Sequence, residues 1–259
     1  MRLPRPGLLG LGLALTAVLG GLGGLVAVNR MATQTVHQER TYPFNGTQLA
    51  VEAALGSVQI VPGEPGQIVV RRTMTYGLRR PSVEERVDGD TFRVSDETCP
   101  VESAFPCRVR WLLQVPRDLD VEVRTGAGSI AVSGLSGKVK LTSDAGAVRA
   151  TGPSGKLVTL RSHDGPVTAQ NISSAQVVAT SDNKGVQLTF RSPPALVVGR
   201  SQKGPVGVVL PEGDDAYKIS AKSQGGSRTV AARTSDDAKR RIDILSATGD
   251  VSVIQSPEG

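Results

Sequence analysis

A repeat of about 19 residues runs through the second half of the chain and constrains its fold more than any other feature. Residues 126–165 read GAGSIAVSGLSGKVKLTSDAGAVRATGPSGKLVTLRSHDG, in which one pattern occurs twice. The glycines that open successive units are Gly128, Gly146, Gly165, Gly185 and Gly204. Such regular spacing is typical of repeat proteins, in which each unit stacks on its neighbours.

Each unit contains two short stretches in which aliphatic and polar residues alternate, which indicates half-buried strands. Turn-forming segments such as SGLSG and TGPSG separate the two stretches. So short a unit has no room for a helical crossover. We therefore expect successive coils to stack so that one valine per unit forms an inward-facing column. These valines are Val139, Val158, Val177 and Val197.

Related patterns occur on both sides of the regular repeats. Residues 54–72 resemble one more unit, and residues 225–255 carry enough aliphatic positions for one or two others. Residues 109–125 alternate over a greater length, so we expect longer antiparallel strands there that cover the open end of the stack. The sequence thus predicts an all-β fold: a single-stranded-type β-solenoid, or β-helix-like stack, over 126–254, with an antiparallel β cap within 48–125. An aromatic content of 3% suits its narrow aliphatic core.

The N-terminal segment 7–28 carries no charge, and Thr16 is its one polar side chain. As a helix it would measure about 33 Å, against about 30 Å for the bilayer core, so we expect one N-terminal transmembrane helix that acts as a signal anchor. Arg2 and Arg5 precede it, which places residues 1–6 in the cytoplasm and the C-terminal domain outside. Residues 29–47 form a tether. The alternative is secretion after cleavage of a signal peptide.

The two cysteines, Cys99 and Cys107, lie close together in CPVESAFPC. In an oxidising compartment they are expected to form a disulfide, which on the chain-entropy model stabilises the fold by roughly 2.5 kcal/mol. Free thiols and half of a metal site are the alternatives. A lone pair of cysteines without nearby histidine is a weak zinc candidate.

No residue constellation specifies a reaction. Ser162, His163 and Asp164 are adjacent and cannot point at one another as a nucleophile, base and orienting acid must. Other units place Asp144 and Asp182 in the same corner without histidine, which favours a turn, and His37 lies in the polar tether. We therefore expect no catalytic residue and no cofactor.

Charged clusters are also expected to be structural or solvated. The acidic clusters lack the spacing of a calcium loop, and the basic clusters lack the aromatic residues of a nucleic-acid site. An anionic lipid or wall polymer is the partner class that the basic residues would suit. The acidic residues are Asp88, Asp90, Asp96, Glu97, Asp214 and Asp215, and the basic residues are Arg71, Arg72, Arg79, Arg80, Lys239, Arg240 and Arg241.

Residues 111–148, WLLQVPRDLDVEVRTGAGSIAVSGLSGKVKLTSDAGAV, carry a recognisable pattern. A strand with proline precedes a second strand and then units that open on glycine. This pattern resembles the bacterial putative-adhesin family of β-strand-repeat domains, a family of unknown function, and the similarity extends over about residues 56–253. The resemblance implies a β-repeat fold, often behind a single membrane helix, without shared catalytic residues.

We therefore predict a non-catalytic, membrane-anchored extracytoplasmic protein that offers an adhesion-type or scaffold surface at the bacterial cell envelope. Its expected partners are the membrane and either an envelope protein or an anionic polymer, with no nucleic acid. Two alternatives stay open. One is an accessory or regulatory component of envelope-stress sensing, and the other is a carbohydrate-active enzyme, although paired carboxylates on one face are not visible in the sequence.

Overall fold

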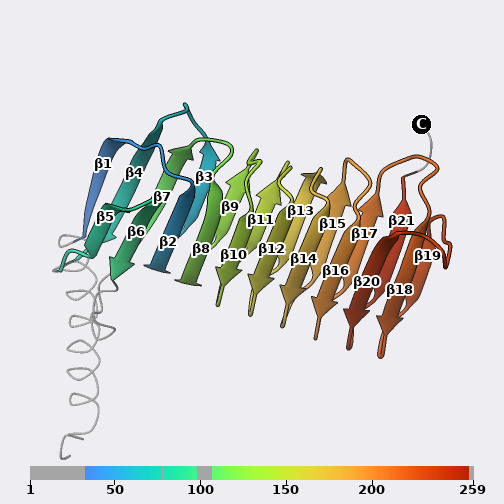
Figure 1. The fold of residues 1–259 in the computed structure, drawn as a ribbon. Coiled ribbons are helices and arrows are strands. Elements are labelled where there is room, and N and C mark those ends of the chain that lie inside the picture. The colour runs from blue at the N-terminus through green and yellow to red at the C-terminus, as the bar shows by residue number, and fades with distance from the viewer. Residues whose placement is uncertain (1–32, 78, 98–106, 257–259) are drawn as a thin grey trace, which may run out of the picture.

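The computed structural model of the chain describes residues 33–77, 79–97 and 107–256. These residues form β-strands and no helix, and the strands make two mixed sheets that face each other in an elongated molecule (Figure 1). None of the described segments is a helix long and apolar enough to cross a membrane. The transmembrane helix predicted at 7–28 lies outside the described residues.

The 11-stranded sheet is called sheet A and the 10-stranded sheet is called sheet B. In spatial order, sheet A consists of β1 (Gln34–Pro43), β4 (Gln67–Tyr76), β7 (Cys107–Val115), β3 (Val58–Pro62), β9 (Ile130–Ser133), β11 (Val148–Thr151), β13 (Val167–Ile172), β15 (Val186–Phe190), β17 (Val206–Leu210), β21 (Val251–Gln255) and β19 (Arg228–Ala231). Sheet B consists of β18 (Tyr217–Ser223), β20 (Arg240–Ser246), β16 (Leu196–Ser201), β14 (Gln176–Ser181), β12 (Leu157–Ser162), β10 (Val139–Ser143), β8 (Asp120–Ala127), β2 (Gln48–Leu55), β6 (Thr91–Glu97) and β5 (Ser82–Asp88).

Each repeat contributes one strand to sheet A and one strand to sheet B, because its two alternating stretches each bury one face. Equivalent strands of neighbouring repeats pair in parallel. In sheet B, Val139 pairs with Val158, Val158 with Val177, and Val177 with Val197. All four valines are buried between the sheets. The predicted inward-facing valine column is thus confirmed.

The described chain is all-β, but the predicted solenoid-and-cap architecture is wrong. The described chain is not a single-stranded-type stack with a separate antiparallel cap behind a helix, but two mixed sheets without any helix. The segment 48–125 joins the same two sheets as the repeats. In particular, β3 pairs in parallel with both β7 and β9, and β2 pairs in parallel with both β6 and β8.

These N-terminal strands join the two sheets because buried and exposed side chains alternate along residues 91–97, 107–115 and 120–127. Their inward side chains match those of the repeats, so these strands extend the same core instead of covering its end. Among the described strands, the antiparallel pairs are β1 with β4, β4 with β7 and β5 with β6, at the left of Figure 1. Trp111, on β7, is fully buried in this part of the core.

The last two coils are also not stacked in sequence order. The coil of β20 and β21 pairs with β16 and β17, and the earlier coil of β18 and β19 lies outside it. Burial explains this arrangement, because Ile242 and Ile244 of β20 are fully buried whereas β19 is largely exposed. The more polar coil thus takes the terminal position, where only one side is covered.

Close backbone contact explains the recurring glycines at the corners. A Cβ atom on Gly146 would lie 2.1 Å from the carbonyl oxygen of Gly128, and one on Gly165 would lie 2.0 Å from that of Gly146. No real Cβ atom approaches an oxygen so closely. The corner glycines therefore set the distance between successive coils.

Candidate functional site

The serines that end the strands of sheet B form a buried row along one corner of the molecule. Each hydroxyl donates to a carbonyl oxygen of the neighbouring coil: Ser143 to Gly128, Ser162 to Gly146, Ser181 to Gly165, Ser201 to Lys184 and Ser246 to Gly204, at 2.7 to 2.9 Å. Four of them also accept a hydrogen bond from the backbone N–H three residues later. The serines therefore satisfy backbone groups that the tight corner leaves without a strand partner.

This geometry separates Ser162 from His163. The hydroxyl of Ser162 is fully buried and engaged by two backbone groups. The imidazole of His163 is exposed, and its Nδ1 lies 2.8 Å from Oδ2 of Asp182 in the next coil. This hydrogen bond and the charge of Asp164 raise the pKa of His163. The two residues face different surroundings and do not form a nucleophile and base.

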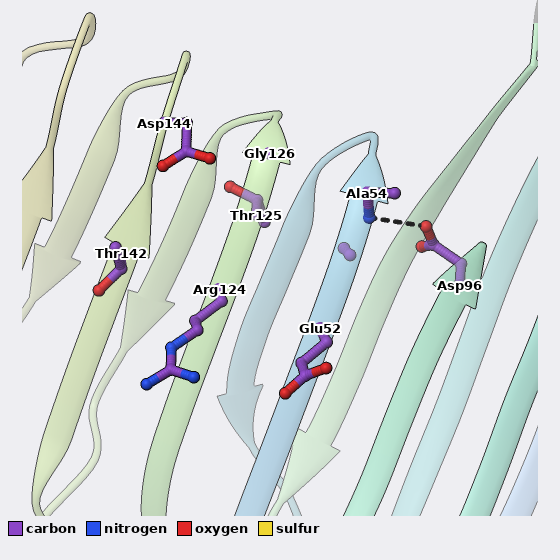
Figure 2. Close-up of a pocket in the computed structure, with 9 residues that line it drawn as sticks. Glu52, Ala54, Asp96, Arg124, Thr125, Gly126, Thr142 and Asp144 are labelled. Atoms are coloured by element: carbon purple, nitrogen blue, oxygen red, sulfur yellow. Dashed lines mark hydrogen bonds between the residues drawn. The ribbon is translucent and has the colours of Figure 1, made fainter. Parts of the chain in front are cut away.

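An open depression lies over the ends of β6, β2, β8 and β10 in sheet B, and Figure 2 shows the residues around it. Its volume is about 420 Å³, and Glu52, Asp96, Arg124 and Asp144 supply its charged groups. Asp96 turns toward β2, where it accepts a hydrogen bond from the backbone N–H of Ala54 at 2.8 Å (Figure 2).

Asp96 also links the two sheets. Its Oδ2 accepts a hydrogen bond of 2.7 Å from the indole N–H of Trp111, which lies on β7 of sheet A. Burial raises the pKa of the Asp96 carboxyl, and this effect is larger than the opposite effect of the hydrogen bonds from Trp111 and β2. Since both oxygens are occupied by protein donors, this carboxyl holds the fold together and offers no free base.

The other acidic residues that the sequence singled out are dispersed over the surface. Asp88 pairs with Arg93 at 3.0 Å, Asp214 with Arg233 at 2.7 Å, and Asp215 with Arg240 at 2.9 Å. Within the described residues, no three histidine, cysteine or acidic side chains gather as a metal site would require.

The basic cluster around residues 71–80 divides between the two faces of sheet A. Arg71 points outward and pairs with Glu39 at 2.9 Å. Arg72 points inward, is buried, and pairs with Glu85 on β5 of sheet B. These two arginines, adjacent in the sequence, therefore do not share one surface.

The sequence did not reveal the buried polar cluster that Arg72 joins. Glu85 also accepts a hydrogen bond of 2.5 Å from the hydroxyl of Tyr42, and Oε1 of Gln38 accepts one of 2.8 Å from Nε of Arg72. These side chains come from β1, β4 and β5, which tie the edges of the two sheets together. No local motif could indicate the cluster, because its members meet only through pairing of distant strands.

The outer face of sheet B carries a short row of two half-buried valines, Val178 on β14 and Val198 on β16, which are in register. Leu157 and Leu196 lie in the neighbouring outward row, where Gln176 of β14 separates them. Leu245 is in register with Arg200. On one side of the row, Lys138 and Lys140 pair with Asp120 and Glu122, and on the other Arg200 pairs with Asp243 at 2.9 Å. The face therefore offers apolar area between neutralised charges.

The predicted disulfide cannot be placed in full. Cys107 begins β7 and is half-buried, whereas Cys99 lies outside the described residues. The pairing of Cys99 with Cys107 therefore stays a prediction.

Comparison with known proteins shows a similarity of fold. No family model and no curated protein matches the chain. The structure of a putative adhesin from Bacteroides fragilis matches with a TM-score of 0.50 and 12% identity, over 85% of this chain and 97% of that chain. A putative adhesin from Parabacteroides distasonis matches with a TM-score of 0.49 and 9% identity, over 84% and 97% of the two chains. The similarity to the Bacteroides fragilis protein supports an adhesin-like fold.

Proposed function

We propose that this chain is a non-enzymatic surface protein of the bacterial cell envelope, whose outer sheet faces make adhesive or scaffolding contacts. The observation that carries the proposal is the aliphatic row on the outer face of sheet B. Val178 and Val198 are half-buried in the chain, and the apolar area that they still expose can be buried only against another surface. The adhesin name of the structurally similar Bacteroides fragilis protein agrees with this role.

The surroundings of the row are better suited to contact with another protein than to catalysis. A shallow hollow of about 270 Å³ continues it over β8, β10 and β12, where Leu157 and Thr159 meet the paired charges of Lys140 and Glu122. Interfaces combine such an apolar centre with a polar rim. An envelope protein with an aliphatic patch is the partner that this face fits.

Location is the second element of the proposal. The uncharged segment 7–28 is long enough to cross the hydrocarbon core, and the arginines before it favour a cytoplasmic N-terminus. Attachment through this segment would leave residues 33–256 outside the cell, with the outer faces of both sheets open to contact.

The test compares the attachment of bacterial cells that produce the full chain with that of cells carrying Val178→Glu and Val198→Glu. We expect the double variant to lower attachment to the level of cells lacking the gene, because two carboxylates would have to be desolvated at the interface. The measurement is the number of cells retained on a surface under flow.

A matched control places the same two charges on the other sheet. Thr168→Glu and Gln187→Glu lie outward on β13 and β15 of sheet A, and should leave attachment unchanged. Equal attachment by cells with and without the gene would refute the adhesive role, and equal effects of the two double variants would refute the assignment to sheet B.

A further inference from the structure

The outer face of sheet A carries two exposed arginines at the end where β1 begins, β4 ends and β7 begins. Arg108 pairs across the strands with Thr75, and Arg110 pairs with Thr73. On the other side of β4, Thr73 pairs with His37, whose Nδ1 lies 3.0 Å from the threonine hydroxyl. Each arginine thus lies beside a threonine hydroxyl of β4, and the three neighbouring strands stand at the left of Figure 1.

These arginines differ from the others nearby. Arg71, on the next row, is neutralised by Glu39. Arg108 and Arg110 are exposed, and among the described residues neither has an acidic side chain within ion-pair distance. Their charges are therefore available to a partner.

Two hollows adjoin Arg110. One, of about 400 Å³, lies over β1, β4 and β7 and includes Thr73 and the aliphatic side chain of Leu112. It is also lined by Glu39 and Arg71, which neutralise each other in an ion pair of 2.9 Å. The other, of about 370 Å³, lies at the corner of the coils and includes Arg108. Arg110 and Ser57 line both hollows. A guanidinium, hydroxyl donors and an aliphatic wall together match a phosphate ester that carries an apolar chain.

The described chain also begins at this end of the molecule, with Gln34 of β1 following Val28 by only six positions in the sequence. The chain from Val28 to Gln34 can span at most about 20 Å when fully extended. Thr35 and His37 therefore lie within a short reach of whatever holds residues 7–28. A bilayer that contained this segment would present its head groups to the same end of sheet A.

We propose that Arg108 and Arg110 bind the head groups of anionic phospholipids in the membrane to which residues 7–28 attach the chain. The inference rests on the membrane attachment in the proposed function and adds a second contact with the same bilayer. Two basic residues held beside an anionic surface orient the β-sheets relative to the membrane.

The experiment uses the full chain in nanodiscs of phosphatidylcholine alone, or of phosphatidylcholine and phosphatidylglycerol in equal parts. Arginine side chains are labelled with phenylglyoxal and quantified by mass spectrometry. We expect Arg108 and Arg110 to react several-fold more slowly in the anionic discs, and high salt to remove the difference because the charges are then screened. Arg149 and Arg191, exposed on the coils further along, should react equally in both discs.

A pair of matched variants tests whether the two arginines act together. Arg110→Gln should raise the labelling of Arg108 in anionic discs toward its level in neutral discs, whereas Arg149→Gln should leave it unchanged. Equal labelling of Arg108 and Arg110 in the two kinds of disc would overturn the inference and leave the proposed function standing.

Two further outcomes are decisive. Protection of both arginines by added polyphosphate in neutral discs, without any effect of phosphatidylglycerol, would overturn the lipid assignment in favour of an anionic polymer. A chain that enters neither kind of disc would overturn both the membrane attachment and this inference.

Discussion

The buried serine row gives the sharpest prediction about stability, and Ser162 is its best-defined member. Its hydroxyl is fully buried, donates to the carbonyl of Gly146 at 2.7 Å, and accepts from the N–H of Gly165 at 2.8 Å. Ser162→Ala leaves both backbone groups buried without these partners. Since each unsatisfied buried group costs about 1–3 kcal/mol, we expect the free energy of unfolding to fall by about 2–4 kcal/mol.

Urea unfolding of the full chain in mild detergent, followed by circular dichroism, measures this loss. Ser192→Ala is the control, because the Ser192 hydroxyl makes only a 3.4 Å contact with Ser173 near the surface. The control should change the free energy of unfolding by less than about 0.5 kcal/mol. If Ser162→Ala were no more destabilising than Ser192→Ala, the serine row would not hold the coils together.

Three further predictions concern other parts of the fold. Gly146→Ala should destabilise the protein by several times the roughly 1 kcal/mol expected for Gly152→Ala. The reason is that a Cβ atom on Gly146 would meet backbone of the preceding coil, whereas one on Gly152 would meet no atom. Thermal unfolding of the two variants measures the difference. Burial raises the pKa of the Asp96 carboxyl, so the folded protein keeps this proton to higher pH than the unfolded chain does. The free energy of unfolding of the wild type, relative to that of Asp96→Asn, should therefore fall as the pH rises from about 4 through the raised pKa. Denaturant titrations across this pH range measure the difference. Arg72→Met and Glu85→Met should each lower the free energy of unfolding by about 3–5 kcal/mol, since each leaves one buried charged group without its partner. The double variant Arg72→Met with Glu85→Met should recover most of that loss, which a double-mutant cycle of the three variants measures.

Local pattern was enough to identify the candidate residues but not their partners. Neighbouring units close on a serine, as in TSDAG and RSHDG, but only the structure shows that Ser162 binds backbone of the adjacent coil. His163 could be assigned to a corner from its neighbours, but its pairing with Asp182 depends on how closely two coils stack. Arg71 and Arg72 read as one basic cluster, although adjacent residues of a strand point to opposite faces.

Arg108 and Arg110 were not singled out by the sequence, because their importance comes from exposure and from the strands beside them. Alternation around Trp111 does indicate that both arginines point outward. That they stand at the end of the sheet where the described chain begins follows only from the pairing of β1 with β4 and of β4 with β7.

The all-β class, the strands of the regular repeats and their register could all be predicted from the amino-acid sequence. A period of two residues within each stretch and of about 19 residues between units leaves one way to bury the valine column. The packing of distant strands was needed to show that the described part of residues 48–125 continues the same two sheets, and that the coil of β20 and β21 precedes that of β18 and β19 in space. The order of strands in a sheet depends on which strands bury more apolar surface against each other. This is a comparison between distant segments, so the local sequence of one segment does not reveal it.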